Sequence, residues 1–386
     1  MLVNHPKILF IADEIPQTKN AGSIQFYRLL QEYPPERLIV MGRQTEHDVE
    51  KLPCSYYSFN FPLAERLRVT RFTSFVGDAQ ALGFFLKPLP TDLEKIADSF
   101  KPEVIISLMQ NITFYYPAYF YAKKKNIPLV LFCHDDAEHF SRIHKTFENH
   151  LLKRNSKIYQ YATKRLCISP EMAVRWREKY GVPGDYIYPI ASDDIISMPI
   201  QSNIALKSGG DNLTIGYAGS LAYGYLEGIQ EILPILEKSG ALMRIYSDKL
   251  PGYPESKNIF YAGFSKFAEQ TWRRIQDECD AVIIPYSSET SFKNLYTTHF
   301  PSKLPEYIKL GLPIIINGPD YCNGKLWSNK YPRAILSCNT GNLFETLTDL
   351  LAGSFRMHLV EEILKIKDFE NQVAREKLLY HLNQIA

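Results

Sequence analysis

The sequence predicts an α/β protein built from two doubly wound domains. Short apolar runs of the buried-strand type alternate with helical patterns through most of its 386 residues, as parallel sheets covered on both faces require. The alternation pauses at residues 191–210, a polar stretch that ends in Ser-Gly-Gly, and then starts again. A chain of this length suits about two to three typical domains. We therefore expect domains at 1–190 and 211–353 with a linker between them.

The first domain is predicted to open with a strand, Lys7–Ala12, a polar loop, Asp13–Ser23, and a helix, Ile24–Tyr33. Apolar runs bounded by polar or helical segments predict further strands at Arg37–Met41, Val104–Leu108, Leu129–Cys133, Arg165–Ile168 and Tyr186–Ile190. Helical spacing predicts Thr113–Lys125 and His150–Lys164 as helices.

The second domain repeats this alternation. Its predicted strands are Leu213–Tyr217, Leu242–Tyr246, Ile259–Tyr261, Ala281–Pro285 and Pro313–Ile316, and its predicted helices are Glu227–Ser239, Lys266–Cys279 and Lys303–Leu310. The charged stretch 354–386 is predicted to be a last helix. Its apolar side chains fall at helical spacing and need a partner surface: Leu359, Ile363, Ile366 and Phe369.

Composition narrows the classes of function. The formal net charge is only +2, which argues against a strongly basic nucleic-acid binder. The six cysteines form no C-x-x-C pair, so neither a disulfide scaffold nor a zinc module is indicated and a reducing cytoplasm is expected. No apolar run approaches the roughly 20 residues of a membrane helix. Any membrane contact is therefore expected to be peripheral.

Two glycine-bearing loops are candidate phosphate sites. Gly22 precedes the first predicted helix, and Gly219 with Ser220 follows the first strand of the second domain. Glycine lets the backbone approach a ligand, and a helix N-terminus offers N–H groups to a phosphate. An ordinary turn capped by Ser23 is the alternative at the first loop. No G-x-G-x-x-G follows the first strand, which removes the main support for a dinucleotide dehydrogenase.

The most specific stretch runs from Phe300 to Ile316. Ser302 and Lys303 stand at a predicted helix start, where they can meet a phosphate, and Glu306 is placed to accept hydrogen bonds from a sugar diol. Gly311 and Pro313 end the helix before a buried strand. The alternative is a capping box formed by Ser302 and Glu306, although their spacing of four residues makes it imperfect.

With this stretch the chain resembles the GT-B glycosyltransferases, and it is most similar to family 4. In that family a segment P-S-K-x-x-E-Y-x-x-x-G-x-P-[VI]-[VI] binds the nucleotide sugar, and its Glu holds the ribose. Other family-like pieces occur in the expected order: Gly22, His134, Leu166–Met172, Pro189–Asp193, Gly219–Leu221, Tyr261–Phe264 and Asp280–Pro285. The resemblance implies two Rossmann-like domains that face each other across a cleft, and a C-terminal helix, 354–386, that packs back on the first domain.

The resemblance also implies a function. A sugar would move from a nucleotide-diphospho sugar, UDP- or GDP-linked, to a glycan, lipid-linked or small-molecule acceptor, in a hexosyltransferase reaction without a metal or other cofactor. The residues expected at the donor are Gly22, Gly219, Ser220, Phe264, Ser302, Lys303 and Glu306. Lys303 would also stabilise the leaving diphosphate.

The acceptor site is expected in the first domain. His134 and Asp135 follow the predicted strand Leu129–Cys133. His134 could bind the transferred sugar, and Asp135 or Asp136 could act as the base for the acceptor hydroxyl. Asp13 and Glu14 are alternative carboxylates. A hydrogen-bonded loop histidine and solvated loop charges are the plainer interpretations of these residues.

Two departures from family 4 leave alternatives open. Thr298 stands where the family usually has a second Glu, eight residues before Glu306, and the segment Ser220–Gly228 lacks the usual basic pair. An inverting enzyme, a catalytically silent sugar-nucleotide or glycan-binding subunit, and a GT-B sugar-nucleotide epimerase all remain compatible with these differences.

A basic segment predicts a possible surface contact. Lys153, Lys157 and Lys164 fall on roughly one face of the predicted helix, in a domain with a basic excess. The plain interpretation is a solvated face. The more specific interpretation is a surface that binds an anionic membrane or a lipid-pyrophosphate acceptor. Such a surface would place the protein in the cytoplasm, peripherally at the inner face of the membrane.

Overall fold

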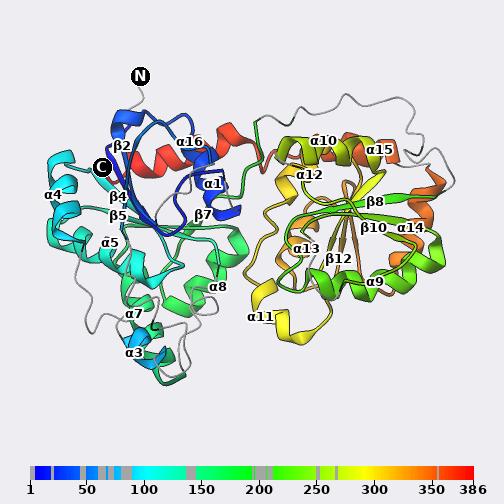
Figure 1. Ribbon diagram of the computed structural model, residues 1–386, viewed down its shortest axis with the longest axis horizontal. Helices are drawn as coiled ribbons and strands as arrows, with labels where there is room; N and C mark the ends of the chain where they lie inside the picture. The colour runs from blue at the N-terminus through cyan, green and yellow to red at the C-terminus, as the bar shows by residue number, and fades with distance from the viewer. Residues whose placement is uncertain are drawn as a thin grey trace. The chain divides into compact units, whose positions relative to one another are not determined.

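The computed structural model describes residues 5–18, 21–43, 49–59, 67, 74–79, 89–135, 145–193, 195, 206, 212–248, 253–265, 268–353 and 356–386. The chain divides into two compact units, Met1–Pro189 with Asn371–Ala386, and Ile190–Glu370 (Figure 1). The first unit is therefore discontinuous in sequence, because the last residues of the chain return to it.

The first unit contains a parallel sheet with the strand order β3-β2-β1-β4-β5-β6-β7. Its strands are β1 (Ile8–Ala12), β2 (Leu38–Gly42), β3 (Ser55–Ser58), β4 (Val104–Leu108), β5 (Leu129–Cys133), β6 (Lys164–Cys167) and β7 (Asp185–Tyr186). Ile8 of β1 pairs with Leu38 of β2 on one side and with Val104 of β4 on the other. Every residue of β1, β2, β4 and β5 is buried, as expected for strands covered on both faces.

Helices lie on either side of this sheet (Figure 1). They are α1 (Ala21–Leu30), α3 (Ser74–Ala79), α4 (Thr91–Phe100), α5 (Ile112–Lys125), α7 (Glu148–Tyr161), α8 (Pro170–Tyr180) and α16 (Asn371–Asn383), with 3-10 turns at Pro35–Arg37 and Lys145–Phe147. The sequence fixes several ends locally: Asn111 caps α5 by accepting from the Thr113 N–H, and Ser169 caps α8 by accepting from the Met172 N–H. Helix α16 lies beside α1.

The second unit has a parallel sheet with the order β10-β9-β8-β11-β12-β13. Its strands are β8 (Thr214–Ala218), β9 (Leu242–Tyr246), β10 (Ile259–Tyr261), β11 (Ala281–Pro285), β12 (Ile314–Asn317) and β13 (Ile335–Cys338). Its helices are α9 (Tyr225–Ser239), α10 (Ala268–Glu278), α11 (Lys293–Tyr296), α12 (Leu304–Leu310), α13 (Asn323–Ser328), α14 (Leu343–Ala352) and α15 (Arg356–Ile363), with a 3-10 turn at Thr290–Phe292. Helices α9 and α14 pack together, as do α10 and α12. The two doubly wound α/β domains that the sequence predicts are thus confirmed.

Each sheet has one point where the strand order reverses, between β1 and β4 in the first unit and between β8 and β11 in the second. Ligands of open α/β sheets bind outside the carboxyl ends of the strands at such a point. The residues that follow these four strands are therefore placed for ligand binding.

Three local predictions are wrong. Helix α1 begins at Ala21, so Gly22 and Ser23 lie inside its first turn and not in the preceding loop. Lys164 belongs to β6, so it does not share a helical face with Lys153 and Lys157 of α7. Lys303 precedes α12, which begins one residue later than predicted.

The C-terminal stretch also differs from the prediction of one helix over 354–386. Helix α15 belongs to the second unit and only α16 returns to the first. The reason is packing: the Phe369 ring lies 5.2 Å from that of Trp327, whose indole N–H donates to Asp368 over 2.8 Å. The apolar positions Leu359, Ile363, Ile366 and Phe369 are buried in the second unit. The predicted linker, 191–210, lies mostly outside the described residues.

Candidate functional site

A glycine-bearing loop, residues 219–224, joins β8 to α9 at the strand-order reversal of the second sheet. Gly219 and Gly224 have φ values of +124° and +86°, a region that other residues rarely adopt. The Gly219 N–H donates to the Tyr246 carbonyl over 3.1 Å. A Cβ at Gly219 would lie 3.2 Å from Lys303 Nζ. The loop backbone can therefore approach Lys303 because Gly219 has no side chain.

Lys303 directs its ammonium group into a cluster of tyrosines. Its Nζ donates to Tyr217 Oη over 2.7 Å and lies 3.9 Å from the centre of the Tyr225 ring. Tyr217 in turn donates to the carbonyl of Ser220. Burial in these surroundings lowers the pKa of Lys303 well below its usual range. No carboxylate among the described residues forms an ion pair with Lys303, so an anionic ligand would supply the missing counter-charge.

Helix α12 places the carboxylate that the sequence singled out. Glu306 lies in its first turn and is buried, with 5% of its surface exposed. Ser302 is exposed and Lys303 occupies the N-cap without a side-chain capping bond. The alternative interpretation of Ser302 and Glu306 as a capping box is therefore wrong.

A tyrosine joins α12 to the end of β8. The pairing of β8 with β11 reaches only Ile215 and Gly216, so the later residues of β8 need other partners on that side. The Ala218 N–H donates to Tyr307 Oη over 3.0 Å. This bond holds the helix that follows Lys303 against the strand that precedes Gly219, and so brings Lys303, Gly219 and Ser220 together.

The other predicted donor residue, Phe264, lies apart from that group in the sheet order. It follows β10, two strands away from β8, after Gly263 with φ +64°. Its ring is 48% exposed. An exposed aromatic ring beyond a strand end is available for stacking, but the described contacts do not connect it to Lys303.

Thr298, at the position of the usual first Glu of family 4, has a structural role in this chain. It is buried, and its hydroxyl donates to the carbonyl of Leu295 over 3.1 Å. Its own carbonyl accepts from the Asn323 side chain over 3.3 Å. Thr298 therefore closes the turn after α11, and unlike a glutamate it carries no charge.

In the first unit, two carboxyl groups follow β1 at the strand-order reversal. A Cβ at Gly22 would lie 1.4 Å from Glu14 Oε2, so the Glu14 carboxyl occupies the space that a side chain at position 22 would need. Burial, with the neighbouring charges of Asp13 and Asp135, raises the pKa of Glu14 to about 8. Burial also raises the pKa of Asp13, opposed in part by Arg43 and a hydrogen bond from Asn111.

His134 and Asp135 follow β5, in the same unit. The imidazole stacks on Phe26 of α1, with ring centres 4.8 Å apart and planes 16° apart. Burial lowers the pKa of His134 to about 4, against the opposing charge of Asp135. His134 is therefore neutral near pH 7 and can both donate and accept a hydrogen bond. Asp136 lies outside the described residues.

Several residues of both sites escaped the sequence analysis. Glu14 was only an alternative there, and Tyr217, Tyr225 and Asn111 were not singled out. Their common signal is position: each lies in or next to an element that ends or begins at a strand-order reversal. Reading that signal requires the strand order, which the sequence alone does not contain.

Two further observations concern the described residues only. They contain no group of three or more His, Cys, Asp or Glu side chains arranged to hold a metal ion. None of the helices they form is long and apolar enough to cross a membrane.

Comparison with known proteins extends these observations. The family model of Glycosyltransferase Family 4 matches residues 43–191. A search of curated proteins gives no match. Among solved structures, a glycosyltransferase from Rickettsia africae aligns with a TM-score of 0.66 at 10% identity, covering 99% of each chain. Sucrose-phosphate synthase from Thermosynechococcus elongatus aligns with a TM-score of 0.62 at 10% identity, again over 99% of each chain.

A third structure, the glycosyltransferase SnogD from Streptomyces nogalater, aligns with a TM-score of 0.50 at 13% identity, over 98% of this chain and 100% of that one. At identities of 10 to 13%, the likeness to these structures shows the fold alone. The two-domain fold is that of the GT-B glycosyltransferases. Residues 43–191 are similar to Glycosyltransferase Family 4.

Proposed function

We propose that the protein transfers a hexose from a UDP- or GDP-linked sugar to a glycan, lipid-linked or small-molecule acceptor, without a metal ion. The observation that carries this proposal is the Lys303 ammonium, held among tyrosines at the strand-order reversal of the second sheet and next to the Gly219 backbone. Lys303 is half-buried, and its ammonium group has no carboxylate partner among the described residues, which favours an anionic ligand. A nucleoside diphosphate is the anion that the family resemblance implies.

In this proposal each donor residue has one task. The Lys303 ammonium meets the diphosphate together with the backbone N–H of Ser220, Gly219 lets the loop come close because it has no side chain, and Ser302 adds a hydroxyl. The bond between the anomeric carbon and the phosphate oxygen breaks during transfer, so negative charge grows on the diphosphate. A cation placed beforehand beside that oxygen stabilises the transition state more than the bound donor.

We assign the ribose of the donor to Glu306 and the base to the exposed ring of Phe264. Glu306→Gln should weaken nucleotide binding by about 1–3 kcal/mol, because a charged hydrogen-bond acceptor becomes neutral. Calorimetry with UDP and GDP measures this loss. Glu345→Gln, in the first turn of α14, is the matched control and should bind like the wild type. Unchanged affinity in a folded Glu306→Gln protein would remove Glu306 from the donor site.

We place the acceptor at the carboxyl ends of β1 and β5 in the first unit. Glu14 retains its proton near neutral pH because its pKa is raised to about 8, which leaves Asp135 as the proposed base for the acceptor hydroxyl. Neutral His134 would hydrogen-bond the transferred sugar. Gly22 remains a predicted donor residue, although Glu14 occupies the space in front of it.

A donor panel tests the whole proposal. UDP-, GDP- and TDP-sugars are incubated with the protein, and slow hydrolysis or transfer is followed by nucleotide release. Release from one donor class is the expected result. Thr298, which carries no charge and serves the turn after α11, favours one alternative, a subunit that binds sugar nucleotides without transferring the sugar. Binding of a donor without any release would support that alternative.

We also propose peripheral contact with an anionic membrane through the first unit. Support comes from exposed basic side chains on α7, Lys153 and Lys157, and from apolar side chains on α3, where Phe75 is 49% and Val76 51% exposed. Sedimentation with vesicles of phosphatidylglycerol is the measurement. The double variant Lys153→Glu and Lys157→Glu should lose binding, and equal sedimentation would refute the contact.

A further inference from the structure

The tip of the Lys303 side chain is held by one hydroxyl group. Its Nζ donates to Tyr217 Oη over 2.7 Å, and the centres of the Tyr217 and Tyr225 rings lie 4.0 and 3.9 Å from Nζ. A ring face attracts a cation over a broad area, whereas a hydrogen bond restricts both distance and angle. Among the described contacts, the one with the Tyr217 hydroxyl therefore sets where the Lys303 charge lies.

The backbone carbonyl of Ser220 orients that hydroxyl. A tyrosine hydroxyl has one proton to donate, and the proton of Tyr217 goes to the Ser220 carbonyl. The oxygen then offers only lone pairs to Lys303. Burial raises the pKa of Tyr217 well above its usual range, so the hydroxyl retains its proton near neutral pH. Lys303, Tyr217 and Ser220 thus form a chain of hydrogen bonds that runs in one direction.

Tyr217 itself lies in a closely packed part of the second unit. It pairs with Ile245 of β9 in the sheet, and its side chain is buried. The next residue, Ala218, donates its N–H to Tyr307 Oη over 3.0 Å, and the Tyr307 N–H in turn donates to the Lys303 carbonyl one helical turn back. Two hydrogen bonds from neighbouring residues of β8 therefore join the strand to the start of α12. A ring packed in this way keeps its hydroxyl in one place.

Lys303 depends on this support. In the described part of the chain its ammonium group has no polar partner other than Tyr217, and a lysine side chain is long and flexible. A lysine that rotates freely spreads its charge over many positions, of which only some lie beside the leaving phosphate oxygen. A charge that is already in place stabilises the transition state without reorganisation during the reaction.

We propose that Tyr217 is a positioning residue of the donor site, which acts by holding the Lys303 ammonium group beside the diphosphate. The inference rests on the proposed function, in which Lys303 stabilises the leaving group. Tyr217 needs no contact with the donor to act in this way. The alternative role of its hydroxyl is to hold the loop 219–224 through the Ser220 carbonyl. The two roles predict different results in a double-mutant cycle.

The cycle combines Tyr217→Phe with Lys303→Ala. Tyr217→Phe keeps the ring and removes only the hydroxyl. Tyr121→Phe is the matched control, because Tyr121 is a buried residue of the first unit whose hydroxyl donates to Asp98 over 2.9 Å. Steady-state kinetics with the donor found in the panel gives kcat and KM, and thermal unfolding shows which variants are folded.

Tyr217→Phe should lower kcat by about 10-fold to 10²-fold and change KM less, because the charge remains but is no longer held in place. When Lys303→Ala is already present, Tyr217→Phe should change kcat by less than about twofold, because no ammonium group remains to be positioned. Tyr121→Phe should retain the kcat of the wild type.

An equal loss of kcat with and without Lys303 would assign the Tyr217 hydroxyl to the loop and overturn the inference. Wild-type kcat in a folded Tyr217→Phe protein would also overturn it, as would an equal loss of kcat in Tyr121→Phe. Each of these results leaves the proposed function intact. If the wild type turns over no donor in the panel, the proposed function fails and the inference fails with it.

Discussion

A lysine that precedes a helix normally keeps its ammonium group in water, and Lys303 instead lies among Tyr217 and Tyr225. The N-terminus of a helix is also an unfavourable place for a cation. Both costs are offset if an anion binds beside the ammonium group. The loop after β8, residues 219–224, contains no Lys or Arg, so Lys303 is the cation that we propose for the diphosphate.

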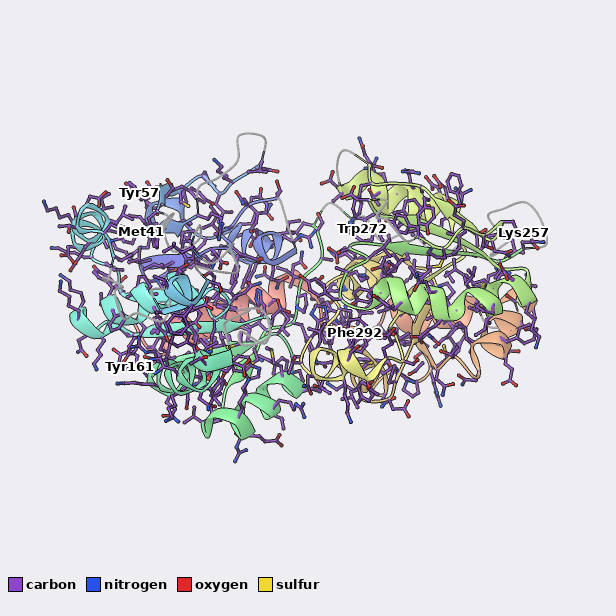
Figure 2. All side chains as sticks on the ribbon, turned by 60° about the horizontal axis from the view of Figure 1, so that its bottom comes forward. Met41, Tyr57, Tyr161, Lys257, Trp272 and Phe292 are labelled. Atoms are coloured by element: carbon purple, nitrogen blue, oxygen red, sulfur yellow. The ribbon has the colours of Figure 1, made fainter. Side chains whose placement is uncertain are left out.

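Lys303→Ala should therefore lower kcat by roughly 10²–10³-fold while changing donor affinity less, by analogy with the loss of one preorganised charge-stabilising donor. Steady-state kinetics with the donor found in the panel is the measurement. Lys257→Ala is the matched control, because Lys257 is an exposed lysine of the same unit (Figure 2). Near-wild-type turnover of Lys303→Ala would favour the alternative, a subunit that binds sugar nucleotides without transferring the sugar.

The raised pKa of the Glu14 carboxyl predicts how the stability of the protein depends on pH. Its pKa is about 4.5 in the unfolded chain and is raised to about 8 in the folded protein, so the folded state holds a proton that the unfolded state has released between these values. Its contribution to stability is fully present below about 4.5 and is lost as the pH rises to about 8. Glu14→Gln should flatten the fall of the unfolding temperature between pH 5.5 and 8.5. A variant with the same fall would show that Glu14 is ionised in the folded protein.

The two sites differ in how far the sequence could predict them. Lys303 and Glu306 belong to one short segment, so a local pattern identifies them. The pKa of Glu14 is raised by burial and by the charges of Asp13 and Asp135. Asp135 is far from Glu14 in sequence and reaches it only through the order of the strands. A local pattern contains no information on such a contact.

At the scale of elements, the bonds between α12 and β8 position the candidate donor site. Strand β8 separates from β11 near its carboxyl end, and Tyr307 supplies the partner for the Ala218 N–H. The strand can therefore end in a glycine loop without leaving a buried N–H group unsatisfied.

Tyr307→Phe should lower the free energy of unfolding by about 1–3 kcal/mol, because it leaves the Ala218 N–H buried and unpaired. Tyr321→Phe is the matched control in the same unit: Tyr321 Oη is buried with no hydrogen-bond partner among the described residues, so losing it should cost little. Chemical denaturation of both variants is the comparison. Equal stabilities would mean that water or a shift of the loop satisfies the Ala218 N–H.

Strands that contain an apolar run were predictable, and the strand without one was not. The bounds of β4, β5, β9, β10 and β11 agree with the predicted ranges. Strand β3 was missed, because its sequence Ser-Tyr-Tyr-Ser has no apolar run and its residues are half-buried or exposed at the sheet edge. The start of α1 was misplaced because Gly22, a poor helix former, is required there by the Glu14 carboxyl.

At the scale of the whole chain, the first unit is completed by residues that follow the second. Helix α16 docks on it through polar and apolar contacts: Arg375 Nε donates to the Arg28 carbonyl over 3.0 Å, and Lys377 Nζ and His381 Nε2 lie 3.0 and 3.2 Å from the Asp185 carboxylate. Leu378 and Leu382 are buried beneath the helix. The stability of the first unit should therefore depend on the last residues of the chain.

Leu378→Ala should destabilise the first unit by about 2–5 kcal/mol, since it opens a cavity at a side chain that is 2% exposed. Hydrogen exchange measured by mass spectrometry should then show lost protection in Met1–Pro189 and Asn371–Ala386, with Ile190–Glu370 unchanged. Val373→Ala is the control on the same helix, because Val373 is 48% exposed and its truncation should cost less than about 0.5 kcal/mol. Lost protection throughout both units would mean that they unfold as one.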